Sequence, residues 1–174
     1  MGTGMFDWRD YGNGIIAFDA GYVRPILAAI HLVVEAGRVA FIDTGSNDSL
    51  SNAQAALERL GLNAAAVDYV ILTHIHLDHA GGAGSMMEAF PNAKLVVHPR
   101  GARHMSEPSQ LVAGVTAVYG EAYVHRVYGK IIPVPAERII EAHDGCTLSL
   151  AGRELLCLDT PGHARHHICI VDRK

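Results

Sequence analysis

A largely apolar stretch at 67–72 runs directly into a dense run of metal-ligand side chains, and this junction limits the fold more than any other feature. The apolar stretch predicts a buried strand. The residues that follow are His74, Ile75, His76, Leu77, Asp78, His79, Ala80, Gly81 and Gly82. Side chains alternate along extended backbone, so His74 and His76 project to the same side and can bind one metal ion. Asp78 and His79 are expected in a loop that the two glycines allow to bend tightly.

Strands and helices alternate along the rest of the chain, which predicts an α/β layer structure. Strands are expected at 14–18, 28–35, 38–42, 67–72, 94–97, 148–150, 154–158 and 167–171. Ala36 and Gly37 predict a tight hairpin turn between the second and third of these strands. Helices are expected from 48 or 49 to 60 and at 81–90, and the stretch 100–130 is mostly helical by its pattern.

A second group of histidines follows a strand in the same way as the first. His163, His166 and His167 come after a loop that begins at Asp159, where the strand at 154–158 ends. Loops at strand ends are where α/β proteins place reactive groups on a rigid support. Imidazole and carboxylate groups together suit zinc, iron or manganese. The two groups of histidines therefore predict a metal site.

Three motifs resemble those of the metallo-β-lactamase fold superfamily. The segment 73–82 resembles its signature, Ile42-Asp43-Thr44-Gly45 its earlier strand-end motif, and Asp159-Thr160-Pro161-Gly162-His163 with His167 its third motif, in the form seen in glyoxalase II. The resemblance spans residues 42–171 and implies an αββα sandwich. It implies one metallo-β-lactamase-like domain over 1–174, made of the N-terminal half and the start of the second half, with a helical insertion at about 100–130.

The same resemblance implies a site for two divalent metal ions. The residues that it assigns to metal are His74, His76 and His163 for the first ion and Asp78 and His79 for the second. Zinc is the first choice of metal, with iron and manganese as alternatives.

The resemblance also implies roles around the metal. Asp78 is the expected catalytic residue, because it would orient the nucleophile and help to pass a proton to the leaving group. Asp43 and His167 are expected to support the ligands, and His166 is not expected to touch metal. The helical insertion is the expected substrate wall or dimer contact, and its tyrosines could line a pocket, although core packing is their favoured role.

The sequence departs from the superfamily pattern after the third motif. The superfamily supplies an aspartate that bridges both metals and a final histidine, and neither motif is present. Asp172 is the nearest candidate for that aspartate, but Arg173 and Lys174 behind it favour a turn. The expectation is an incomplete second half, with the missing ligands supplied by further sequence.

The expected reaction is hydrolysis by a metal-bound hydroxide, because a divalent ion lowers the pKa of water to about 7. The resemblance implies a thioester, a lactone or a related small ester or amide as the substrate. Two alternatives stay open: a mononuclear iron sulfur dioxygenase of the same superfamily, and a non-catalytic metal-binding fragment that needs its C-terminal half.

Composition and charge exclude several classes of partner. The formal net charge is −4 and basic residues form no block, which disfavours nucleic acid. No apolar stretch is long enough to cross a bilayer, and the first ten residues lack the pattern of a secretory signal. Three cysteines without a Cys-x-x-Cys pair indicate reduced thiols and a cytoplasmic protein, with Cys157 and Cys169 in the core. A small-molecule substrate is expected, and a homo-oligomer is left open.

Overall fold

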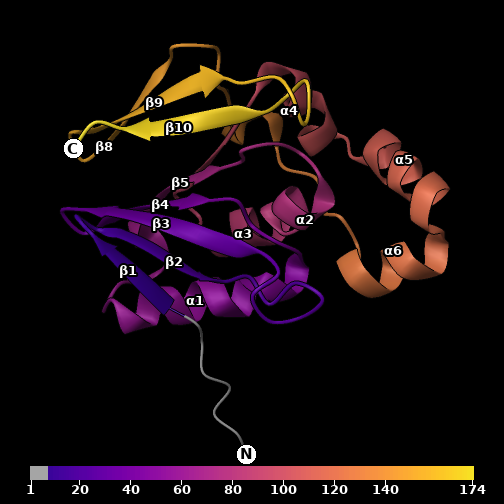
Figure 1. Ribbon diagram of the computed structural model, residues 1–174, viewed down its shortest axis with the longest axis horizontal. Coiled ribbons are helices and arrows are strands. Elements are labelled where there is room, and N and C mark those ends of the chain that lie inside the picture. Colours follow the sequence, from indigo (N-terminus) through magenta and orange to yellow (C-terminus); the bar gives the residue numbers. More distant parts are fainter. Residues whose placement is uncertain (1–7) are drawn as a thin grey trace, which may run out of the picture.

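The computed structural model describes residues 8–174, which form one large and one small β-sheet with helices around them (Figure 1). Residues 1–7 lie outside the described residues. The prediction about a secretory signal in the first ten residues therefore falls mostly on this part of the chain. The large sheet has the strand order β1-β2-β3-β4-β5-β6-β7. Its strands are β1 (Trp8–Gly12), β2 (Ile15–Asp19), β3 (Ala29–Glu35), β4 (Arg38–Ile42), β5 (Val67–Ile71), β6 (Lys94–Val97) and β7 (Ile139–Glu141).

The large sheet changes from antiparallel to parallel at β4. Strands β1 to β4 pair antiparallel, whereas β4, β5, β6 and β7 run parallel. The predicted hairpin between β3 and β4 is confirmed. Its turn residues Ala36 and Gly37 both have positive φ angles, of 45° and 76°, as a two-residue turn between twisted strands requires. The parallel strands end at one edge of the sheet, and the histidine run begins at this edge.

Helices cover one face of the large sheet. From α1 (Leu50–Arg59), Ala56 and Leu57 pack against it, and from α3 (Ala83–Ala89), Met86 and Met87 do the same. The sheet residues on this side alternate along the strands and include Ile30, Leu32, Val39, Phe41, Val70 and Leu95. This alternation reflects the opposite directions of successive side chains in a strand.

The small sheet packs on the other face, above β3 to β5 in Figure 1. It consists of β8 (Thr147–Leu150), β9 (Arg153–Asp159) and β10 (Ile168–Asp172), in the order β10-β9-β8. The large-sheet residues that contact it are those whose side chains point away from the helices, such as Val33, Ala40, Ile71 and Val96. From the small sheet, the contact includes Leu148, Leu150, Leu155, Cys157 and Ile168. Burial on both faces explains why the central strands are apolar almost throughout. The predicted α/β fold class is confirmed, with helix, sheet and sheet as successive layers.

The structure corrects the sequence-based expectation in three places. Asp78 and His79 do not lie in a loop, because the chain forms a short helix there, α2 (Leu77–Ala80), whose N-cap is His76. The helical stretch is divided into α4 (Pro99–Ser106), α5 (Ser109–Tyr119) and α6 (Glu121–Tyr128). The sequence did not predict β1, a mostly exposed edge strand, or β7, which has three residues, since neither has an alternating apolar pattern. None of the described helices is long and apolar enough to span a membrane.

The two cysteines predicted for the core have different environments. Cys157 is buried between the sheets, where burial and the neighbouring Cys146 raise the pKa of its thiol to about 12. Cys169 is exposed, because it alternates along β10 with the buried Ile168. The prediction of a core position is therefore confirmed for Cys157 and wrong for Cys169.

A buried arginine joins the two sheets. The Arg153 side chain, on β9, is 1% exposed and donates two hydrogen bonds to Asp172 of β10. It also donates to the carbonyl oxygen of Asn13 at 2.6 Å and lies 3.4 Å from the Glu35 carboxylate. The hydrogen bond from Arg153 holds the pKa of Asp172 below its usual value. Asp172 is therefore the last residue of a strand and half of an ion pair, rather than part of a turn.

Replacing Arg153 by methionine is expected to lower the free energy of unfolding by about 3 kcal/mol, because Asp172 loses its partner and the Asn13 carbonyl its donor. Denaturant unfolding at neutral pH measures this loss. The loss should shrink below about pH 4, since a carboxyl group with a lowered folded pKa contributes stability above its unfolded pKa and loses it as the pH falls. The control R153K keeps the charge without the paired geometry and should lose less. An R153M protein as stable as the native chain would contradict this account.

Candidate metal centre

The candidate site lies where three segments meet at one edge of the large sheet. Asp43 follows β4 and Thr73 follows β5, and the two strands are parallel neighbours. The loop 160–167 between β9 and β10 reaches the same place, because Ile168 donates a backbone hydrogen bond of 2.8 Å to the Thr73 carbonyl. Both sheets therefore contribute residues to the site.

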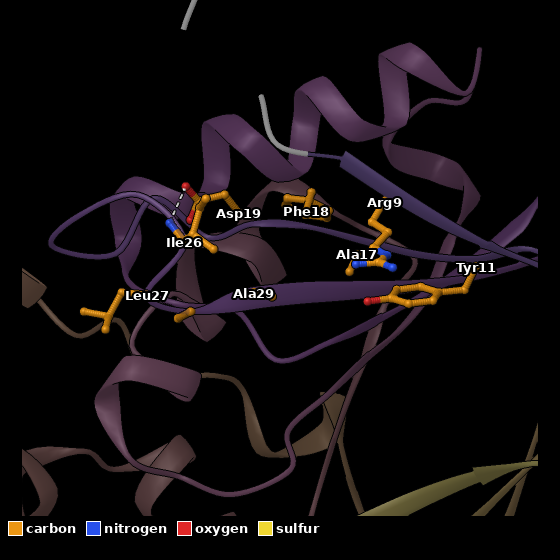
Figure 2. A pocket seen from close by; sticks show the side chains of 9 residues that line it. Arg9, Tyr11, Ala17, Phe18, Asp19, Ile26, Leu27 and Ala29 are labelled. Atoms are coloured by element: carbon orange, nitrogen blue, oxygen red, sulfur yellow. Dashed lines mark hydrogen bonds between the residues drawn. The ribbon is translucent and has the colours of Figure 1, made fainter. Parts of the chain in front are cut away.

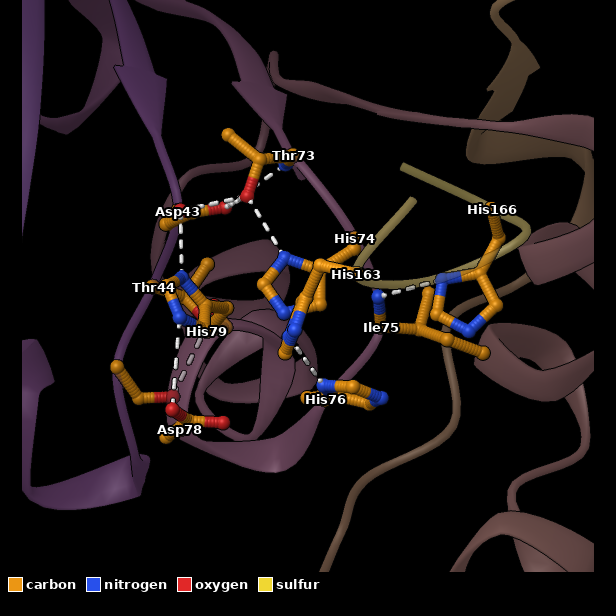
Figure 3. A network of polar contacts seen from close by, with 11 residues as sticks. Asp43, Thr44, Thr73, His74, Ile75, His76, Asp78, His79, His163 and His166 are labelled. Atoms are coloured by element: carbon orange, nitrogen blue, oxygen red, sulfur yellow. Dashed lines mark hydrogen bonds and ion pairs between the residues drawn. The ribbon is translucent and has the colours of Figure 1, made fainter. Parts of the chain in front are cut away.

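Asp43 is the centre of a hydrogen-bond network at this edge (Figure 3). Its Oδ1 accepts from the backbone N–H of Thr73 at 2.8 Å, and its two oxygens lie 3.0 and 2.9 Å from the Thr73 hydroxyl. Its Oδ2 lies 2.8 Å from Nδ1 of His79. The backbone of Asp43 has a positive φ of 64°, which aspartate tolerates better than most residues. The structure thus places the predicted supporting residue directly beside the histidines.

This network determines which nitrogen of His74 is free. An ionised carboxylate only accepts hydrogen bonds, so the Thr73 hydroxyl donates to Asp43. The Thr73 oxygen then accepts from Nδ1 of His74, 3.0 Å away, and the lone pair of the ring is left on Nε2. This Nε2 is buried and has no hydrogen-bond partner among the described residues. A buried nitrogen with an unused lone pair, oriented from its other side, is what a metal ligand requires.

His74, His76 and His163 form what we call the three-histidine group. One ring nitrogen from each lies within 4.8 Å of the others, and Nδ1 of His76 is 3.1 Å from Nε2 of His163. Burial, reinforced by the neighbouring histidines, lowers the pKa of His74 to about 3, and burial with His163 also lowers the pKa of His76. A neutral imidazole is the form that binds a cation. The donor set fits a divalent ion, because three nitrogen donors with one position open are typical of catalytic zinc sites.

Asp78 and His79, the residues predicted for a second ion, lie beside this group on α2. The His79 ring centroid is 4.2 Å from that of His74, and its Nε2 is 3.4 Å from an Asp78 oxygen. Burial disfavours the charged His79 ring, but the hydrogen bond and charge of Asp43 raise its pKa overall. A metal ion must therefore compete with a proton more strongly at His79 than at His74. The three-histidine group is the more favourable of the two positions for a metal ion.

The other histidines of the second cluster lie outside the three-histidine group. Nδ1 of His167 is 2.9 Å from the Thr160 hydroxyl, and its ring centroid is 5.4 Å from that of His74. Nδ1 of His166 accepts a hydrogen bond of 3.4 Å from the Ile75 backbone, and burial lowers the pKa of this ring. Their supporting and non-ligand roles stay predictions.

Sequence reasoning missed two residues that shape this edge. The Thr73 hydroxyl connects Asp43 to His74 by hydrogen bonds and so orients the His74 ring. Its position between a strand and the first histidine could have indicated this role from the sequence. His98 is 7% exposed and lies directly after β6. It accepts a hydrogen bond from the Arg100 N–H at 3.0 Å, which caps α4, and its Nε2 is 3.5 Å from Asp159. Its position directly after β6 was the available signal.

Gly82 allows the two strand-end loops to touch. A Cβ atom there would lie 2.5 Å from the Ser46 carbonyl oxygen and 2.9 Å from that of Thr44. The Thr44 hydroxyl in turn donates to the His79 carbonyl oxygen at 2.8 Å. Since these loops pack backbone against backbone, a side chain at Gly82 would move His79 away from Asp43.

The three-histidine group opens into a cleft of about 440 Å³. The cleft is lined by His76, Leu77, Asp78, Leu111, Gly114, Val115, Val118, Tyr119, Tyr128 and His163. One wall is therefore made by α5 and α6, the segment expected as a substrate wall. Tyr119 and Tyr128 line the cleft. The prediction of core packing is wrong for Tyr119, which is exposed and stacks on Tyr123, and is confirmed for Tyr128, which is buried.

A separate hollow of about 360 Å³ lies beside β1, β2 and the loop before β3 (Figure 2). Its lining includes Arg9, Tyr11 and Ile26, and it shares no residue with the histidine cluster. The carboxylate of Asp19 in this hollow accepts a hydrogen bond of 3.0 Å from the Ile26 backbone, so it serves to hold the loop. The groups suited to chemistry converge at the first cleft.

Comparisons with known proteins agree with this fold. A family model described as the metallo-beta-lactamase superfamily matches residues 23–174. A metallo-beta-lactamase fold-containing protein of Sulfurisphaera tokodaii is 26% identical over 164 residues, which cover 91% of this chain and 59% of that protein. A lactamase-like protein of Pestalotiopsis microspora is 28% identical over 132 residues, which cover 75% of this chain and 30% of that protein.

Solved structures show the same fold at low identity. The Rm3 metallo-beta-lactamase superposes with a TM-score of 0.71 at 20% identity, over 95% of this chain and 55% of that one. A metallo-beta-lactamase of Cronobacter sakazakii superposes with a TM-score of 0.67 at 23% identity, over 92% of this chain and 55% of that one. The chain thus spans less than two thirds of the length of these relatives.

Replacing Asp43 by alanine is expected to weaken zinc binding by about 10- to 100-fold, because the orientation of His74 and His79 depends on its carboxylate. Competition with a chromophoric chelator measures the affinity, and circular dichroism checks that the variant folds. Asp48, an exposed aspartate on the following turn, provides the matched control D48A, which should bind as the native chain does. Equal affinity in D43A and D48A would show that the network does not support the metal.

Proposed function

Because the chain belongs to the metallo-beta-lactamase superfamily, we propose that it is a metal-dependent hydrolase that acts at the three-histidine group. The observation that carries this proposal is Nε2 of His74, which is buried, has no hydrogen-bond partner within residues 8–174 and lies within 4.8 Å of ring nitrogens of His76 and His163. A cleft of small-molecule size opens beside these nitrogens. A structural metal site would be closed by a fourth protein ligand, whereas a catalytic site keeps one position open.

We propose two positions for a divalent ion. His74, His76 and His163 would hold the first ion, and Asp78 with His79 would hold the second. When bound, such an ion would polarise a carbonyl group and lower the pKa of water. Zinc remains our first choice, and iron and manganese accept the same imidazole and carboxylate donors.

The chain's own side chains would position the reactants. The Asp78 side chain is 41% exposed and lines the cleft, so it can accept a hydrogen bond from a water molecule and later pass a proton to the leaving group. Tyr128 lines the same cleft, and its hydroxyl lies 2.8 Å from that of Tyr22. Burial raises the pKa of Tyr128, so its hydroxyl keeps its proton at neutral pH and can donate a hydrogen bond.

We propose a thioester or lactone, or a related small ester or amide, as the substrate. This is supported by the similarity of the segment 159–163 to the motif found in glyoxalase II, and by the size of the cleft. We also propose that the domain acts in the cytoplasm on a small molecule, with neither nucleic acid nor a membrane as partner. The acidic net charge of −4 supports the exclusion of nucleic acid.

Replacing His76 by alanine is expected to abolish both metal binding and turnover of a thioester or lactone, because two imidazoles at the first position hold a cation too weakly. Elemental mass spectrometry of the purified chain and a hydrolysis assay with added zinc measure the two effects. The matched control is H143A, since His143 is an exposed histidine whose only ion-pair partner among the described residues is Glu141.

Retained hydrolysis by H76A would refute the proposal. Consumption of oxygen with a persulfide substrate by an iron-loaded native chain, without hydrolysis, would also refute it and would support the sulfur dioxygenase alternative instead.

A further inference from the structure

Helix α5 is apolar but buries none of its residues. Its sequence, Ser-Gln-Leu-Val-Ala-Gly-Val-Thr-Ala-Val-Tyr, holds no charged side chain. Val118 and Tyr119 near its C-terminal end are 72% and 58% exposed. An uncharged helix on the surface is unusual, because surface helices normally turn a polar face to water. The residues of α5 are therefore better suited to contact an apolar group than to remain in water.

One face of α5 is turned to the three-histidine group. Leu111, Gly114, Val115 and Val118 recur at spacings of three and four, which place them on the same side of a helix. All four line the cleft that also holds His76, Asp78 and His163. The proposed reaction centre and the apolar face thus line one cleft.

The apolar half of this cleft offers no partner for a charged group. Neither lysine nor arginine is among the residues that line it, and its charged and ionisable members are confined to the metal side and to two tyrosines. The Tyr128 hydroxyl, which lies 2.8 Å from that of Tyr22, is uncharged and so is no counter-ion for a charged substituent. A charged substituent placed against α5 would lose its water without gaining a counter-ion, whereas a hydrocarbon chain would be stabilised there.

We propose that the face of α5 defined by Leu111, Gly114, Val115 and Val118 binds the uncharged hydrocarbon part of the substrate's acyl chain. This inference rests on the proposed hydrolase function and narrows its substrate class to fatty acyl thioesters or acyl-substituted lactones. The scissile carbonyl lies at the histidine side of the cleft, and the acyl chain extends along α5.

Gly114 provides the room for this chain. A Cβ atom added to Gly114 would meet nothing within 4 Å, so the space beside it is open. Glycine inside a helix costs about 1 kcal/mol relative to alanine, and here the missing side chain widens the cleft. A large side chain at this position would fill the cleft without clashing with the backbone.

The first arm of the test measures chain-length selectivity. The probes are thioesters of N-acetylcysteamine with acetyl, hexanoyl and decanoyl groups, which differ only in the apolar chain. The value of kcat/KM is expected to rise about fourfold for each methylene group that enters the cleft. G114F should lose this rise with chain length, whereas A113F, at an exposed position of α5 that does not line this cleft, should keep it. G114A, which adds one methyl group and favours the helix, should retain the selectivity of the native chain.

The second arm does not require turnover. Titration of 1-hexanol into the isotopically labelled native chain, followed by methyl NMR, should produce saturable shifts at Leu111, Val115 and Val118. The same titration of G114F should produce none, and its thermal unfolding curve shows whether it is folded. Saturable shifts support an acyl-binding face even if no substrate is hydrolysed, which separates this inference from the proposed function.

Two results would overturn the inference. One is the absence of methyl shifts in the native chain, whether or not it hydrolyses thioesters. The other is a concentration-dependent dimer that G114F dissociates while chain-length selectivity is unchanged, because α5 would then be covered by a second copy of the chain.

Discussion

The Asp43 carboxylate, at the end of β4, accepts hydrogen bonds from Thr73 and His79 in the stretch that follows β5, and the orientation of two histidines depends on it. Through the Thr73 hydroxyl it assigns the proton of His74 to Nδ1, and directly it holds Nδ1 of His79. Each ring is thereby left with Nε2 to offer. Asp43 reaches both because its backbone turns with a positive φ at the end of β4, next to the end of the parallel strand β5. A single acceptor thus orients His74 and His79, which both follow β5, before any ion is bound.

The packing of the two sheets brings the third histidine, His163, to the site, and Asp43 makes no contact that would do this. His163 comes from the loop that leaves the small sheet, so the three-histidine group is complete only when the two sheets are packed together. The hydrogen bond from Ile168 to Thr73 brings that loop to the edge of the large sheet. Arg153 of the small sheet links the two sheets through the Asn13 carbonyl, which lies between β1 and β2. It also pairs with Asp172, the last residue of β10, whereas Ile168 is the first. The geometry of the metal centre therefore depends on the packing of the two sheets against each other.

Much of this could be predicted from the sequence, because the strongest signals are local. The strand before His74, the hairpin at Ala36 and Gly37 and the small-sheet hairpin all follow from short patterns of apolar and turn residues. The convergence of His74, His76 and His163 followed from the resemblance of motifs rather than from periodicity. What the sequence concealed depends on tertiary contacts: the short helix at Asp78, the burial of His98 and the relay through Thr73. The ion pair of Asp172 was also hidden, because Arg153 lies 19 residues earlier in the chain.

The most direct test of the account is X-ray absorption spectroscopy at the zinc edge of the zinc-loaded chain. The account predicts nitrogen and oxygen donors at about 2.0–2.1 Å with the multiple scattering of several imidazole rings, because the three-histidine group holds the ion. A sulfur shell at about 2.3 Å would contradict it, since the metal would then be bound by cysteine. A chain that retains no zinc after dialysis would contradict it equally.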